Sequence, residues 1–124
     1  MSGRGAAGVA VMVLAAWCQA AAAGQVLSGD QIRQRLIGNT VSGMLDASEG
    51  GPSPYAEYYD PDGTIRGDGY TGRWTIEGDT ICLSFEDSPR ACWQVSAEGD
   101  DIEWILDGRV EGNGKVTPGN PNRF

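Results

Sequence analysis

Acidic side chains are the residues of this 124-residue chain best suited to chemistry, and three short clusters of them stand out. The clusters are Asp60-Pro61-Asp62-Gly63, Glu86-Asp87 and Asp100-Asp101. A calcium-binding EF-hand loop needs its glycine at position 6 and a glutamate at position 12. Gly63 stands only fourth from Asp60, so we predict a β-turn at this cluster and no metal site.

The other two clusters could serve carboxylate chemistry only if two acids faced each other across a cleft, as in glycoside hydrolysis. Both fall in predicted turns, where acidic side chains are usually solvated. The sequence contains no histidine, which excludes Ser-His and Cys-His nucleophiles and the commonest metal ligand. We therefore predict no catalytic residue, no metal ligand and no cofactor, and a protein that is not an enzyme.

Cys82 and Cys92 are predicted to form a disulfide. Their spacing is longer than the C-x-x-C of redox motifs, and they flank the predicted turn at Asp87 symmetrically. In a hairpin centred on that turn, the two cysteines lie directly opposite each other, at a separation a disulfide can span. The pair would be a staple on the polar side of the hairpin.

The first 23 residues, Met1–Ala23, have the pattern of a signal peptide. Arg4 precedes an apolar run, and Ala21-Ala22-Ala23 offers a small-residue cleavage pattern. The richness in Ala and Gly disfavours a membrane-spanning helix, and the bulky Trp17 disfavours a lipoprotein anchor at Cys18. We expect a periplasmic or secreted protein with a single β-domain, Gly24–Phe124.

The formal net charge of −8 is spread along the chain and not concentrated in blocks. Such a charge repels nucleic acid and anionic lipid surfaces. We therefore expect no nucleic-acid partner, no membrane association after signal cleavage, and a monomer.

One short helix is predicted from Gly29 to Ile37. Ser28 and Gln31 match a capping box, and Leu27 and Ile32 occupy the positions of a hydrophobic staple. Gly38 can end the helix in a left-handed conformation.

The remainder alternates apolar and polar residues with a turn every 8 to 12 residues, which predicts antiparallel strands. The first four are Asn39–Leu45, Tyr55–Tyr59, Thr64–Arg66 and Tyr70–Glu77. Later inward rows are Ile81-Leu83-Phe85, Ala91-Trp93-Val95, Ile102-Trp104-Leu106 and Val110-Gly112-Gly114-Val116. The fold class is mainly β: an antiparallel meander that closes into a small up-and-down, calycin-like barrel, with the helix covering one end.

Two groups of aromatic residues are candidate binding residues. Trp74, Trp93 and Trp104 fall on the inner face, where they either fill the barrel or line an apolar, ligand-facing pocket at its mouth. Tyr55 and Tyr59 share the other face of their strand with Glu57. They are a candidate surface for a protein partner, because tyrosine is enriched at interfaces; packing against the helix is the alternative.

The block Gly72-Arg73-Trp74-Thr75-Ile76-Glu77-Gly78-Asp79, with Ile81-Cys82 and Cys92-Trp93, resembles an alphaproteobacterial family of small exported proteins of unknown function. Tyr58-Tyr59, Asp62-Gly63-Thr64 and Gly119-Asn120-Pro121 extend the resemblance from about Gly38 to Pro121. It implies an exported, disulfide-stapled β-domain and no known activity. More loosely, the architecture is similar to that of calycins, a likeness of fold alone.

Three functions follow as hypotheses. The first is a non-enzymatic exported domain that binds a protein partner through loops at one end of the barrel. The second is a lipocalin-like carrier of a small apolar ligand, and the third is a carboxylate-dependent hydrolase.

Overall fold

Nine strands and one helix make up the described part of the chain, residues 24–46 and 51–124 of the computed structural model. The predicted signal peptide, Met1–Ala23, and Cys18 lie outside the described residues. The elements are β1 (Gln25–Val26), α1 (Gly29–Leu36), β2 (Asn39–Leu45), β3 (Ser53–Tyr59), β4 (Thr64–Gly67), β5 (Tyr70–Glu77), β6 (Thr80–Phe85), β7 (Ser88–Glu98), β8 (Asp101–Leu106) and β9 (Arg109–Pro118).

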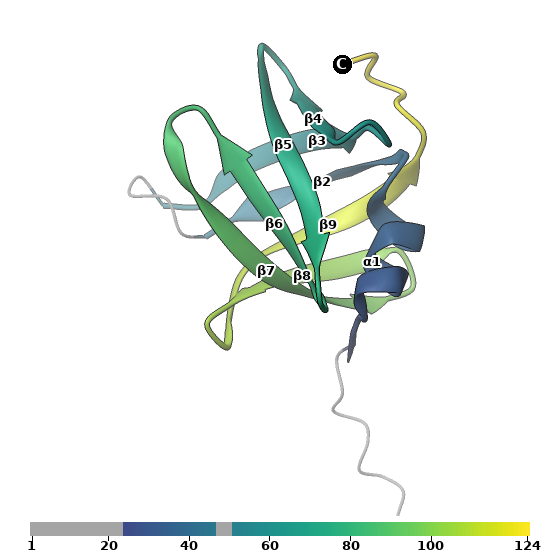
Figure 1. Ribbon diagram of the computed structural model, residues 1–124, viewed down its shortest axis with the longest axis vertical. Helices are drawn as coiled ribbons and strands as arrows, with labels where there is room; N and C mark the ends of the chain where they lie inside the picture. The colour runs from purple at the N-terminus through teal and green to yellow at the C-terminus, as the bar shows by residue number, and fades with distance from the viewer. Residues whose placement is uncertain (1–23, 47–50) are drawn as a thin grey trace, which may run out of the picture.

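The strands from β2 to β9 form a closed antiparallel barrel (Figure 1). Each strand pairs with the next along the chain, and β2 pairs with β9 to close the circle, with Val41 opposite Val116. Closure satisfies the backbone groups that an open sheet would leave unpaired at its edges. The predicted fold class, an up-and-down barrel with one short helix, is confirmed.

The strand β7 is long enough to pair with three other strands. Its first half pairs with β6, and its second half pairs with β8 on one side and β1 on the other, with Gln25 opposite Ala97. The strand β1 was not predicted from the sequence, because two residues are too few to show a period.

The helix α1 begins at Gly29 and covers one end of the barrel, as its sequence predicts. The Ser28 hydroxyl accepts from the Gln31 amide, and the Gln31 side chain accepts from the Ser28 amide, which completes the capping box. The helix ends at Leu36, one residue earlier than predicted, and Gly38 adopts a φ of +85°. Ile32 and Leu36 are completely buried, so α1 closes one end of the barrel, away from the turn between β6 and β7 (Figure 1).

The packed core fills the half of the barrel nearest α1. Aliphatic side chains from the helix and from most strands meet there: Leu27, Ile32, Leu36, Val41, Ile65, Ile81, Val95 and Ile102. Gly29 lies so close to the β5–β6 turn that a Cβ would stand 2.1 Å from the Gly78 carbonyl oxygen. The helix is thus held against this turn as well as against the core. No helix in the described ranges is long and apolar enough to cross a membrane.

A β-bulge in the β8–β9 hairpin corrects one sequence prediction. Trp104 pairs with Gly112, but the next residue, Ile105, pairs with Val110, which leaves Glu111 as the extra residue. The bulge reverses the side-chain alternation, so Val110 is 50% exposed and not part of the inner row.

The predicted disulfide is present. Cys82 and Cys92 are direct cross-strand partners on β6 and β7 and their sulfurs are bonded. The bond ties the hairpin together on the face opposite Leu83 and Trp93.

Replacing both cysteines, as C82A/C92A, is expected to lower the free energy of unfolding by about 2–3 kcal/mol, because the unfolded chain loses a covalent loop. Urea unfolding of the oxidised protein and of the double variant measures this difference. Reduction of the unsubstituted protein should give a similar loss. Equal stability of all three forms would contradict a structural role for the bond.

Candidate functional site

A cavity of about 240 Å³ occupies the half of the barrel that the aliphatic core leaves unfilled. It opens at the end farthest from α1, near the β6–β7 turn. Its walls are mostly apolar and aromatic, and they contain one ionisable carboxyl group: the lining residues are Leu45, Tyr55, Glu57, Tyr59, Leu83, Phe85, Ser88, Pro89, Ala91, Trp93 and Trp104.

Glycines paired with aromatic residues make room for this cavity. Three aromatic side chains that line the cavity each face a glycine on a neighbouring strand: Tyr55 faces Gly43, Phe85 faces Gly72, and Trp104 faces Gly112. Tyr70, which is 42% exposed and does not line the cavity, faces Gly67. A Cβ at Gly72 would lie 2.5 Å from the Phe85 ring, and one at Gly67 would lie 2.2 Å from the Tyr70 ring. The missing side chains of Gly72 and Gly67 let the rings of Phe85 and Tyr70 lie against the barrel wall.

Tyr55 and Trp104 are locked in place by hydrogen bonds. The Trp104 indole Nε1 donates to the Tyr55 hydroxyl over 2.7 Å, and that hydroxyl donates to the Asn113 carbonyl oxygen over 2.7 Å. The Tyr55 hydroxyl thus bridges β3 to β8 and β9. Gly114 leaves space for it, because a Cβ there would stand 2.6 Å from the hydroxyl oxygen.

Glu57 is the buried carboxyl group of the cavity, with an exposed fraction of 9%. Its Oε1 accepts from the Tyr59 hydroxyl over 3.0 Å, and its Oε2 accepts from the Tyr70 hydroxyl over 2.6 Å. Burial raises the pKa of Glu57, although both tyrosine hydrogen bonds work in the opposite direction by stabilising the ionised form. Burial likewise raises the pKa of Tyr55, Tyr59 and Tyr70, so these phenols are neutral.

The three tryptophans that were predicted to face a ligand lie in two different parts of the barrel. Trp93 and Trp104 line the cavity, as the pocket interpretation expected, with their ring centroids 6.2 Å apart. Trp74 does not line it. Trp74 is buried at the helix end, where the Arg33 guanidinium lies 5.6 Å from its ring centroid and its Nε1 donates to the Asp60 carbonyl oxygen.

The expectation of an exposed tyrosine surface is wrong. Tyr59 is completely buried, and Tyr55 lines the cavity beside it. Because alternate residues of a strand share a face, Glu57 points inward with them. The sequence predicted that Glu57 shares a face with the two tyrosines, but it indicated no role for Glu57. The pattern Tyr-x-Glu-x-Tyr, interpreted with its aromatic residues inside, would have found it.

The Asp60–Gly63 cluster is a turn, as predicted. The Asp62 amide donates to Asp60 Oδ1 and the Thr64 amide to Asp62 Oδ1, and Arg66 pairs with both carboxylates. The hydrogen bonds from Thr64 keep the pKa of Asp62 below its usual value. Both carboxylates therefore already have partners within the protein.

The other acidic groups do not converge on a site either. Glu86-Asp87 and Asp100-Asp101 are exposed. Within residues 24–46 and 51–124, one cluster of possible metal-ligating side chains is found. It consists of Glu77, Cys82 and Cys92. The two sulfurs are bonded to each other and Glu77 pairs with Arg90, so this group has no thiolate to offer.

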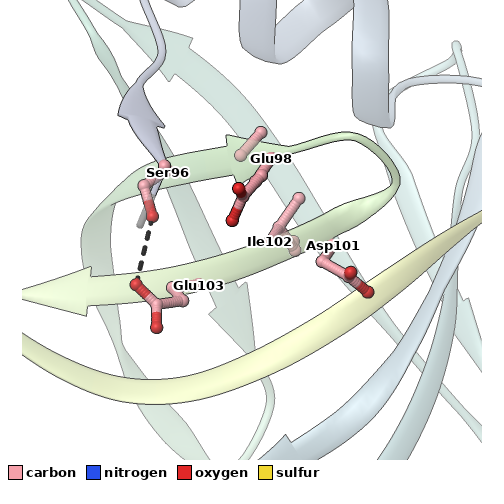
Figure 2. A pocket seen from close by; sticks show the side chains of 7 residues that line it. Ser96, Glu98, Asp101, Ile102 and Glu103 are labelled. Atoms are coloured by element: carbon pink, nitrogen blue, oxygen red, sulfur yellow. Dashed lines mark hydrogen bonds between the residues drawn. The ribbon is translucent and has the colours of Figure 1, made fainter. Parts of the chain in front are cut away.

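A second, shallower recess of about 100 Å³ lies between β1 and the β7–β8 hairpin. Figure 2 shows its acidic lining, with Glu98 and Asp101 beside the turn and Ser96 hydrogen-bonded to Glu103. Asp101 also pairs with Lys115 on β9. Its carboxylates lie at the surface, so the recess has no enclosed volume comparable with that of the barrel cavity.

Comparison of the chain with models of known protein families, with curated proteins and with solved structures finds no match. The function is therefore argued from the cavity.

Removing the Tyr55 hydroxyl, as Y55F, is expected to cost about 1–3 kcal/mol of stability, because the Trp104 indole and the Asn113 carbonyl would each lose a partner. Chemical unfolding measures the loss. Y58F is the matched control, since no hydrogen bond of the Tyr58 hydroxyl is found within the described residues. Equal losses in the two variants would contradict the bridging role of Tyr55.

The buried Glu57 predicts a pH-dependent stability difference from its neutral isostere E57Q. The folded protein holds the Glu57 proton to a higher pH than the unfolded chain does, so ionisation of Glu57 destabilises the fold as pH rises above the ordinary value of 4.5. E57Q should therefore gain stability relative to the unsubstituted protein between acidic and neutral pH. Unfolding at a series of pH values tests this, with the exposed E86Q as control. A difference between E57Q and the unsubstituted protein that does not change with pH would refute it.

Proposed function

We propose that this protein is a non-enzymatic, exported binding domain whose barrel takes up one small, largely apolar molecule. The observation that carries the proposal is the hollow half of the barrel, an aromatic cavity of about 240 Å³ that opens at the end opposite α1. Small-molecule sites are concave and mostly apolar, with a few placed polar groups, and Glu57 is such a group here.

The size of the cavity limits the ligand. A dry protein cavity of about 150 Å³ accommodates benzene, so this cavity suits a molecule with about one ring and a short substituent. The aromatic side chains around it are held by hydrogen bonds and by cross-strand glycines, which favours a cavity that exists before the ligand binds. Such preorganisation lowers the free-energy cost of binding.

A small-molecule ligand is better supported than a protein partner. The Tyr55–Tyr59 pair, the candidate surface for a protein partner, is not exposed, because Tyr59 is completely buried. Export is supported by the disulfide, because such bonds persist mainly in oxidising compartments.

Filling the cavity should abolish binding. A panel of toluene, 2-phenylethanol and 2-phenylethylammonium is titrated into the protein while tryptophan fluorescence is recorded, since Trp93 and Trp104 line the site. We expect a saturable change with at least one compound. A91F places a ring inside the cavity, opposite Leu83, and should remove the response.

Q94F is the matched control, because Gln94 is exposed on the outer face of the same strand. It should bind as the unsubstituted protein does. The proposal fails if no compound of the panel gives a saturable signal with folded protein, or if A91F and Q94F respond alike.

A further inference from the structure

Glu57 lacks a cationic partner inside the cavity. No lysine or arginine of the described ranges forms an ion pair with it, and its two hydrogen-bond donors are the neutral hydroxyls of Tyr59 and Tyr70. A carboxylate has about four lone-pair positions, so two remain for another donor. Burying a carboxylate without a compensating cation is costly.

The remaining cavity wall suits a cation as well. Tyr55, Tyr59, Phe85, Trp93 and Trp104 contribute aromatic rings. The electron-rich face of an aromatic ring attracts a cation, and most strongly where water is excluded. The net charge of −8 adds a long-range attraction for positively charged ligands and repels anions.

We infer that the ligand of this cavity is a small organic amine, bound as its ammonium ion with the charged nitrogen on Glu57 and the apolar part against Trp93 and Trp104. This inference rests on the proposed small-molecule binding function. The inference adds the chemical class of the ligand, which follows from the position of Glu57 in the cavity. A primary ammonium has three N–H donors, enough to use the free lone pairs of the carboxylate.

The chief alternative is a neutral ligand that accepts a hydrogen bond from protonated Glu57. The two cases differ in charge and hardly in shape, so isosteric ligands separate them. 2-Phenylethylammonium and 2-phenylethanol differ only in the terminal group, and both have one ring and a two-carbon chain.

The test is isothermal titration calorimetry with these two compounds at pH 7.5. The unsubstituted protein should bind the ammonium about tenfold or more tightly than the alcohol, because a charge-assisted hydrogen bond is stronger than a neutral one. E57Q should lose about tenfold or more of its affinity for the ammonium and keep its affinity for the alcohol. E86Q removes the same charge near the mouth without touching the cavity, so it should keep both affinities.

The pH dependence gives a readout that needs no variant. Affinity for the ammonium should fall as the pH drops through the pKa of Glu57, while affinity for the alcohol stays constant. The titratable groups that face Glu57 are Tyr55 and Tyr59 on its own strand and Tyr70 on β5, and all three stay neutral. The neighbouring strand β2 presents Val41 opposite Glu57, so Glu57 is the group whose titration is observed.

The outcomes distinguish the two proposals. Equal affinity for the two compounds, an unchanged ammonium affinity in folded E57Q, or an ammonium affinity independent of pH would overturn the amine and leave small-molecule binding in place. If neither these compounds nor toluene binds to the folded, unsubstituted protein, both proposals fall together.

Discussion

The space inside the barrel depends on glycines that face aromatic rings across the sheet. An eight-stranded barrel of this kind is just wide enough for side chains to fill, and near α1 aliphatic residues do fill it. At the other end, Gly43, Gly67, Gly72 and Gly112 contribute no side-chain volume. The rings opposite them can therefore lie along the wall, and the centre stays open. Glycine within a strand weakens the strand, and the hydrogen bonds of Tyr55 reinforce the same end.

Glu57 is a second feature of the cavity that lowers the stability of the fold. A buried carboxylate without a cation destabilises the fold whenever it is ionised, although it gives the buried Tyr59 hydroxyl its hydrogen-bond acceptor. Binding sites commonly retain such unfavourable groups at some expense in stability. The two tyrosine hydroxyls hold the carboxyl group of Glu57 at the wall of the cavity that the aromatic rings line.

Local patterns in the sequence predicted much of the fold. Ser28 and Gln31 defined the start of α1, the bounds of β2 were correct, and the spacing of Cys82 and Cys92 gave their register. These features depend on neighbouring residues alone. The orientation of β3 was not predictable in the same way, because Tyr58 on one face and Tyr55 and Tyr59 on the other give no contrast in polarity. The alternation of apolar and polar residues in β5 predicts that Trp74 points inward, but it does not show at which end of the barrel Trp74 lies. The bulge that exposes Val110 depends on how β8 pairs with β9, which the local sequence does not show.

The helix covers one end of the barrel, and the cavity opens at the other end (Figure 1). The helix packs through Ile32 and Leu36, neither of which lines the cavity. Exchange of Ala91, which lines the cavity and is not part of the buried core cluster, would therefore alter the shape of the cavity with little effect on the packing around Ile32. The shape of the cavity can thus change by substitution at its open end while the helix keeps its position on the barrel.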